Sequence, residues 1–338
     1  MKTGHFAIFW YIIIFVFTIL ISGCAPEEEL IYTGTVEKIV FGVEMSLLPS
    51  LVWVAENQGY FSEQGLDVEI KEFDSGKNAF KTMLEQGNLD MVTVAQTPVM
   101  FNSFNRNDYR IIAGMVSSYK DVNILARKDK GISKPEDLKG KKIGATAGST
   151  GHYFLGLFLT HNGLILSDIE ISDFKATELA QALIDGKVDA ISSWEPNIYN
   201  ARKQLGENAI ILPNKDIFRE DFYFVPNKAF LDKNPQAIER FLKAIEKAEE
   251  FIKNYNEKAI NITAERLKIN QEFVASVWGD FDFNLLLDQS VLSVLENEAR
   301  WAISNNLTNA TEIPNYLNYI YTDALKKVKP EAVAIFGD

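Results

Sequence analysis

Cysteine and histidine are scarce in this sequence, with one cysteine and three histidines among 338 residues. The single cysteine, Cys24, excludes an internal disulfide framework and leaves no cysteine for zinc or catalysis. His152 and His161 lie nine positions apart on one expected helix, which places them on opposite faces, where they cannot chelate one metal. Since a glycine–serine nucleophile elbow is also missing, we expect no enzyme, no metal and no cofactor.

Positive charge is in short supply as well, because 34 basic residues stand against 46 acidic ones, for a net charge of −12. Loss of the first 23 residues removes only Lys2 and leaves 33 against 46, or −13. This balance argues against a nucleic-acid partner. It also means that an anionic ligand must be held by local donors, since the field of the whole protein opposes it.

The longest apolar run, from Phe6 to Ile21, lies at the N-terminus and is followed by Ser22, Gly23 and Cys24. We interpret residues 1–23 as a signal peptide. Residues 21–24 resemble a bacterial lipobox, which predicts lipid on Cys24, a tether over residues 24–36 and a protein anchored outside the cytoplasm, periplasmic or at the cell surface. An uncleaved signal anchor is the alternative, because the run is close to the lower length limit for a spanning helix.

Strand and helix patterns alternate after the tether. Residues 39–43, 66–73 and 91–95 are expected strands, and residues 51–55 and 77–86 are expected helices. Such alternation is typical of an α/β fold with a mostly parallel, doubly wound sheet. In these sheets the loops that leave the carboxyl ends of strands form the ligand crevice, which points to residues 45–49 and 96–98.

A second unit begins near Lys128 and repeats the first in outline. Strands are expected at 142–146, 169–174 and 188–192, with helices at 153–162 and 176–185. The small residues at 147–151 stand before a helix whose free N–H groups could bind an anion or polar group. Beyond a strand at 222–225 the chain is expected to be almost entirely helical to about Lys327 and to pack on the first unit.

Six short motifs lie at residues 56–61, 64–68, 138–144, 148–150, 182–190 and 194–196. In their order and spacing they resemble the nitrate/sulfonate/taurine-type substrate-binding proteins of ABC importers, and the resemblance covers residues 39–230 by motif and the rest by helical pattern. It implies a type II periplasmic-binding fold of two lobes, each a doubly wound sheet. Lobe 1 would comprise residues 37–124 and 225–338, lobe 2 residues 125–224, with crossovers near 122–127 and 222–227.

The candidate ligand-binding residues come from the polar loops of both units. Trp194 would cover a ligand with its flat face, or else pack under the hinge. Glu195 would pair a ligand amine, or else cap a helix or form a salt bridge. The helix start at residues 149–151 would bind an oxyanion. The full set of candidates is Leu48, Pro49, Gln96, Thr97, Ser117, Tyr119, Ser149, Thr150, Gly151, His152, Trp194, Glu195 and Tyr223.

The resemblance implies a monomeric receptor that delivers a small oxyanion-bearing solute, such as an alkanesulfonate, taurine or nitrate, to an ABC permease and its ATPase. A pyrimidine precursor of thiamine is the alternative solute. Glu195 distinguishes the two classes of solute, because a carboxylate favours an aminopyrimidine and repels a bare anion. A ligand-sensing receptor subunit is a further alternative, although the sequence to Asp338 contains no second membrane segment. A pyrimidine-synthase-like enzyme would need histidine or cysteine chemistry that is missing here.

Overall fold

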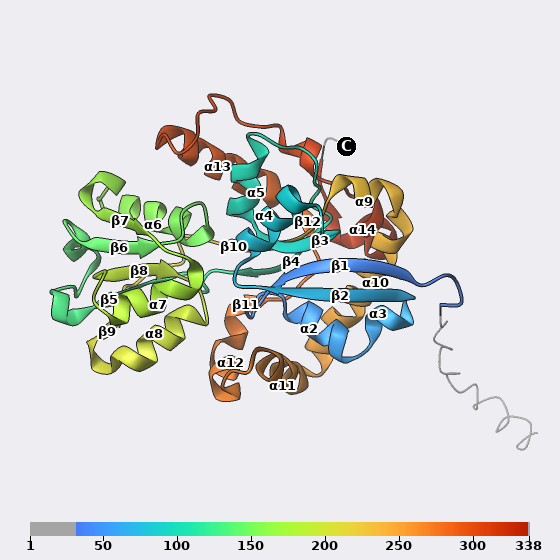
Figure 1. The fold of residues 1–338 in the computed structure, drawn as a ribbon, viewed down its shortest axis with the longest axis horizontal. Helices are drawn as coiled ribbons and strands as arrows, with labels where there is room; N and C mark the ends of the chain where they lie inside the picture. The colour runs from blue at the N-terminus through green and yellow to red at the C-terminus, as the bar shows by residue number, and fades with distance from the viewer. Residues whose placement is uncertain (1–31, 337–338) are drawn as a thin grey trace, which may run out of the picture. The chain divides into compact units, whose positions relative to one another are not determined.

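The computed structural model describes residues 32–336, drawn as a coloured ribbon in Figure 1. The predicted signal peptide and Cys24 lie outside these residues. Within residues 32–336, no helix has both the length and the apolar character needed to cross a bilayer.

The first sheet has six strands in the order β11-β4-β10-β3-β1-β2. Three neighbouring strands, β1, β2 and β3, run parallel because helices carry the chain back between them, whereas β10 is antiparallel to both β3 and β4. β3 is buried along its whole length. The elements are β1 (Glu37–Glu44), α2 (Ser50–Asn57), α3 (Tyr60–Glu63), β2 (Leu66–Phe73), α4 (Gly76–Gln86), β3 (Met91–Ala95), α5 (Gln96–Ser103), β4 (Ala113–Ser118), β10 (Glu220–Pro226) and β11 (Phe281–Asp282).

The second sheet has five strands in the order β7-β6-β8-β5-β9. Here too a parallel group, β7, β6 and β8, is extended by antiparallel strands, β5 and β9. The elements are β5 (Asn123–Arg127), β6 (Lys142–Ala145), α6 (Thr150–His161), β7 (Glu170–Asp173), α7 (Ala176–Ile184), β8 (Ala190–Ser193), α8 (Asn197–Leu205) and β9 (Ala209–Ile211).

The chain passes between the two sheets twice, through residues 119–122 and 212–219. The crossovers implied by the family resemblance, 122–127 and 222–227, correspond closely to β5 and β10. Each of these strands belongs to one sheet only, so the linking segments are the loops that precede them.

Helices after β10 pack on the first sheet, as predicted. Phe241 of α10 meets Phe41 of β1 edge-on, with ring centroids 5.4 Å apart, and Phe224 of β10 at 5.1 Å. Such contacts bury large aromatic areas against the sheet and hold this part in place. The elements are α9 (Lys228–Lys233), α10 (Pro235–Asn254), α11 (Asn256–Leu267), α12 (Gln271–Val277), β12 (Leu287–Asp288), α13 (Ser290–Ser304), α14 (Asp323–Val328) and β13 (Val333–Ala334). Short 3-10 helices occupy Lys128–Lys130, Pro135–Leu138, Leu166–Asp168, Gly206–Asn208, Trp278–Asp280, Tyr316–Tyr319 and Pro330–Ala332.

Two local expectations need correction. Residues 96–98, expected as a loop, form the first turn of α5. Pro98 is tolerated there because its fixed φ suits a helix, and because the N–H groups of a first helical turn have no partner within the helix. The C-terminal part is also less helical than expected, since β11 pairs with the edge of β4 and β12 pairs with β13. The α/β class, with two doubly wound sheets and a helical part on the first, is confirmed.

Candidate ligand-binding cleft

A small cavity lies where loops from the two sheets meet, and it has a volume of about 10 Å³, close to the space of one water molecule. Residues from both sheets line it, which is the arrangement expected of a closed cleft. The lining residues are Glu44, Ser75, Gly76, Lys77, Ala95, Pro98, Ser149, Thr150, Trp194, Glu220 and Phe222.

Glu44 stands at the carboxyl end of β1 and is almost completely buried. Its Oε2 accepts a hydrogen bond from the Gly76 N–H at 2.5 Å, at the start of α4, and its backbone N–H donates to Thr93 Oγ1 at 3.2 Å. Among residues 32–336, no donor is placed to hydrogen-bond its Oε1. Burial raises the pKa of Glu44 to about 8, because the buried site disfavours the charged form. The carboxyl is therefore mostly protonated at pH 7.

Glu220, at the start of β10, forms a second buried acidic position in the cavity. Its carboxyl lies beside that of Asp121. Burial raises the pKa of Glu220 to about 7 and, together with repulsion from Glu220, raises that of Asp121 well above its usual range. No donor nitrogen or hydroxyl reaches either Asp121 oxygen or Glu220 Oε2 among the described residues.

Lys77 is the cation that lines this cavity. Its Nζ, on α4 of the first sheet, donates to the carbonyl of Ala147, in the loop after β6 of the second sheet. Burial lowers the pKa of Lys77, and nearby Asp173 partly offsets this effect. The cavity therefore has two carboxyl groups and one ammonium group on its walls, with the ammonium already bound to a carbonyl.

The predicted residues Ser149, Thr150 and Trp194 meet in this cavity. Ser149 Oγ donates to the Thr146 carbonyl at 2.7 Å, and the Thr150 side chain lies beside the Glu220 carboxyl at the start of α6. The buried Trp194 indole lies next to Glu44. The sequence therefore indicated one wall of the cavity, contributed by the second sheet.

Two of the predicted residues lie next to this wall and do not line the cavity. A Cβ at Gly151 would approach the Ser192 carbonyl oxygen to 2.8 Å, so α6 packs there only because residue 151 is glycine. His152 Nδ1 accepts the Gly148 N–H at 3.2 Å, and burial lowers the pKa of its imidazole. Its ring meets that of Trp301 edge-on, with centroids 5.5 Å apart.

The predicted residues of the first sheet make their contacts inside the protein. Gln96 Nε2 donates to the Arg219 carbonyl at 3.0 Å, and Gln96 Oε1 accepts the Asp221 N–H at 2.8 Å. Thr97 Oγ1 donates to Glu298 at 3.1 Å. Leu48 and Pro49 are buried, and Leu48 belongs to the core of the first sheet. None of the four lines the small cavity, because neighbours at Ala95 and Pro98 take that place.

Glu195 borders a different cavity, of about 320 Å³, which Asp121 and Arg202 also line. Its Oε2 accepts the Tyr199 N–H at 2.8 Å in the first turn of α8, a capping contact. Burial raises the pKa of Glu195 to about 7. Glu195 therefore stands beside the cavity of Trp194 without lining it.

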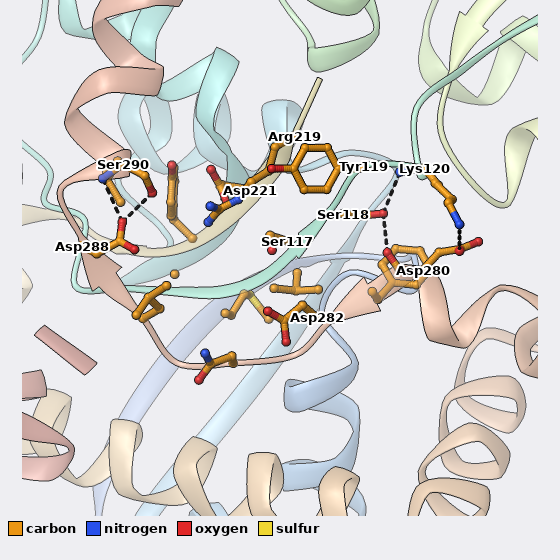
Figure 2. A pocket seen from close by; sticks show the side chains of 18 of the residues that line it. Ser117, Ser118, Tyr119, Lys120, Arg219, Asp221, Asp280, Asp282, Asp288 and Ser290 are labelled. Atoms are coloured by element: carbon orange, nitrogen blue, oxygen red, sulfur yellow. Dashed lines mark hydrogen bonds and ion pairs between the residues drawn. The ribbon is translucent and has the colours of Figure 1, made fainter. Parts of the chain in front are cut away.

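Ser117, Tyr119 and Tyr223 line a third cavity, of about 730 Å³, seen from close by in Figure 2. It shares no lining residue with the small cavity. Within residues 32–336, no group of three or more His, Cys, Asp or Glu side chains is placed to hold a metal ion.

A family model described as "NMT1/THI5 like" matches residues 50–259. The chain belongs to this family. A Bacillus subtilis protein whose name assigns it to the binding of aliphatic sulfonates is 30% identical over 265 residues, which are 76% of this chain and 78% of that protein.

Solved structures show the same fold for this NMT1/THI5-like chain. The alkanesulfonate-binding protein of Xanthomonas axonopodis pv. citri, bound to MOPS, has a TM-score of 0.73 and 16% identity and covers 86% of this chain and 99% of its own. The desulfurization enzyme DSZB has a TM-score of 0.62 and 16% identity, with coverage of 87% and 99%. The resemblance to sulfonate-type substrate-binding proteins is confirmed, and the fold serves both binding proteins and an enzyme.

The sequence did not predict the acidic wall of the small cavity, which consists of Glu44 and Glu220. Glu44 follows the apolar strand at 39–43 directly, so the rule that ligands lie at strand carboxyl ends could have included it. Glu220 and Asp121 are 99 positions apart and meet only in the folded protein. Lys77 had no signal of its own, since a lysine in the first turn of an amphipathic helix is usually solvated.

Proposed function

We propose that this chain is the solute-binding component of an ABC importer and acts outside the cytoplasm. Its family, and the names of the sulfonate-binding proteins that share its sequence or fold, support this role. The observation that carries it is the cavity between the two sheets, because a solute held by both can be enclosed by closure of one part on the other. We propose residues 37–124 with 225–338, and residues 125–224, as the two lobes.

The charge of the cavity narrows the class of solute. Glu44 and Glu220 each present a buried oxygen without a donor, while Lys77 is already bound to a carbonyl. A bare oxyanion would be tolerated only while both carboxyls hold their protons, whereas a protonated or hydrogen-bond-donating nitrogen would also satisfy their ionised forms. The solute of this proposal therefore carries such a nitrogen, and an oxyanion at its other end would meet the start of α6 at Ser149 and Thr150.

An aminoalkanesulfonate fits this description and agrees with the names of the relatives. An aminopyrimidine is the second candidate, and the flat faces of Trp194 and Phe222 on the cavity wall favour it. Both share the amino nitrogen that the carboxyls require. Ligand pairs that differ in this group alone therefore test the proposal.

The decisive experiment compares taurine with ethanesulfonate, and 4-aminopyrimidine with pyrimidine, by isothermal titration calorimetry on the mature chain. We expect the amino member of at least one pair to bind roughly tenfold tighter or more than its partner. Its binding at pH 7 should release protons, because a cation beside Glu44 favours the ionised carboxyl. Equal affinity within both pairs, or proton uptake on binding, would refute the requirement for nitrogen.

We further propose that the chain has no catalytic step. The two serine hydroxyls on the cavity wall are engaged elsewhere: Ser149 donates to the Thr146 carbonyl, and Ser75 accepts the Asn78 N–H as the N-cap of α4. An activated serine needs an adjacent base, and the amine of this cavity, Lys77 Nζ, donates to the Ala147 carbonyl instead. Recovery of the solute unchanged after prolonged incubation, measured by mass spectrometry, tests this point; a new product that depends on the protein would contradict it.

We also propose that the mature protein is attached to the membrane through Cys24. Acyl chains on Cys24 would hold the binding domain near its permease while the segment before β1 acts as a tether. In this arrangement the protein works as a monomer that meets the permease in its closed, solute-loaded form.

A further inference from the structure

The cavity of Figure 2 lies on the face of the first sheet opposite the small cavity. Side chains of a strand alternate between the two faces, so on β10 Glu220 and Phe222 line the small cavity, whereas Asp221 and Tyr223 line the large one. The large cavity measures about 730 Å³, which is ample for a small organic molecule. It is therefore separate from the site proposed for the transported solute.

Two buried polar groups in this cavity lack a partner. Tyr223 is only 1% exposed and its hydroxyl makes no hydrogen bond. Asp221 is 4% exposed; its Oδ1 accepts a hydrogen bond from Arg219 Nε at 2.8 Å and forms an ion pair with Arg219 Nη2 at 2.7 Å. Within residues 32–336, no donor reaches its Oδ2. Buried polar groups in proteins are nearly always satisfied, so two unsatisfied oxygens on residues that line one large cavity point to a ligand that bonds them.

The other charged groups on the cavity wall indicate whether that ligand is a cation or an anion. Lys120 pairs with Asp280 at 2.9 Å, and Arg219 pairs with Asp221, so both cations of the wall are already engaged. Asp288 Oδ1 accepts the Ser290 N–H at 2.8 Å. The wall carries more carboxylates than cations; its carboxylates are Asp216, Asp221, Asp280, Asp282 and Asp288.

We propose that this cavity is a second binding site, for a small organic cation whose ammonium, amidinium or guanidinium nitrogen donates to Asp221 Oδ2 and Tyr223 Oη. A bare metal ion fits less well, since no cluster of metal-ligating side chains forms within residues 32–336. The wall includes Tyr119 and Lys120 of one segment that links the sheets, and Asp216 and Arg219 of the other. The cation would therefore sit against the hinge.

Putrescine, agmatine and the neutral 1,4-butanediol are suitable probes, titrated into the mature full-length protein by calorimetry or ligand-observed NMR. We expect the two cations to bind and the diol not to bind. Tyr223→Phe, which removes only the hydroxyl, and Asp221→Asn should each weaken cation binding by roughly fivefold or more. Thermal denaturation establishes whether each variant is folded. If Asp221→Asn does not fold, the cation affinity of Tyr223→Phe alone tests the proposal.

Glu44→Gln is the matched control, because it removes a carboxylate from the small cavity and leaves this one intact. Cation binding that survives Glu44→Gln and falls in Tyr223→Phe supports the second site. Cation binding that is lost in Glu44→Gln and unchanged in Tyr223→Phe places the cation in the cleft and overturns the proposal, as does a failure of both cations to bind. This experiment does not depend on which solute the cleft carries.

Discussion

Trp301 of α13 lies so close to Gly156 of α6 that a Cβ at residue 156 would be 2.7 Å from the indole Nε1. α6 belongs to the second sheet, while α13 is joined to the first by the hydrogen bond from Thr97 to Glu298. The same indole meets the rings of His152 and Tyr153 edge-on. This contact therefore holds α6 of the second sheet against α13 at one side of the cleft, and it requires glycine at residue 156.

Gly156→Ala should shift the protein toward an open form, since the added methyl group collides with Trp301. We expect a larger radius of gyration by small-angle scattering and solute affinity lowered by roughly tenfold or more, because the open form lacks half of its contacts. Gly279→Ala is the matched control, as nothing lies within 4 Å of a Cβ there. Adding Trp301→Ala should relieve the collision; a double variant as open as Gly156→Ala alone would show that the contact is not the cause.

Glu44 should make the solute-free protein less stable as pH rises. Its pKa is about 8 in the folded protein, above its ordinary value of 4.5, so the folded state holds the proton more tightly. This contribution is fully present below about pH 4.5 and is lost as pH rises through 8, at up to about 1.4 kcal/mol per pH unit. Thermal denaturation between pH 5 and 8 should show a smaller decline in Glu44→Gln than in the wild type.

Glu69→Gln serves as the control for that measurement. Its hydrogen bond with Lys38 lowers the pKa of Glu69 to about 2, so this exposed carboxyl does not titrate between pH 5 and 8. The slope of stability with pH should therefore match the wild type. If Glu44→Gln and Glu69→Gln had the same slope, Glu44 would not be the source of the dependence.

Trp194→Ala should weaken solute binding by about 2 kcal/mol or more, because buried aromatic residues at the centre of a site carry much of its binding energy. Trp194→Phe keeps a flat apolar surface and should lose less. Calorimetric titration of both variants, with their melting temperatures, separates binding from folding. Wild-type affinity in Trp194→Ala would mean that the indole serves packing only.

Cys24→Ala tests the proposed anchor. In the proposed anchor the acyl chain is attached through the thiol, so this variant should leave the precursor unprocessed or yield a mature protein without lipid. Metabolic labelling with a fatty acid and fractionation of cells give the answer. Lipid incorporation at the wild-type level would disprove acylation at this cysteine.

Local pattern predicted most of the strands and helices, because burial repeats every second residue in strands and every third or fourth in helices. β2 and β3 have the predicted ends, while α5 was missed because a proline in a first helical turn looks like a loop. The site was harder to predict. Trp194 and Ser149 follow strands of one sheet, but Glu220, which lies beside Asp121, is brought to the cavity by the tertiary fold alone.

The place of β10 between β3 and β4 has a consequence for the order in which the sheets assemble. All five strands of the second sheet lie within residues 123–211, so they can pair as soon as that stretch is free. Until residues 220–226 arrive, β3 and β4 each expose an edge with unpaired backbone groups, which is a surface prone to aggregation. Any export route that threads the unfolded chain must therefore protect these two edges until about two thirds of the protein has emerged.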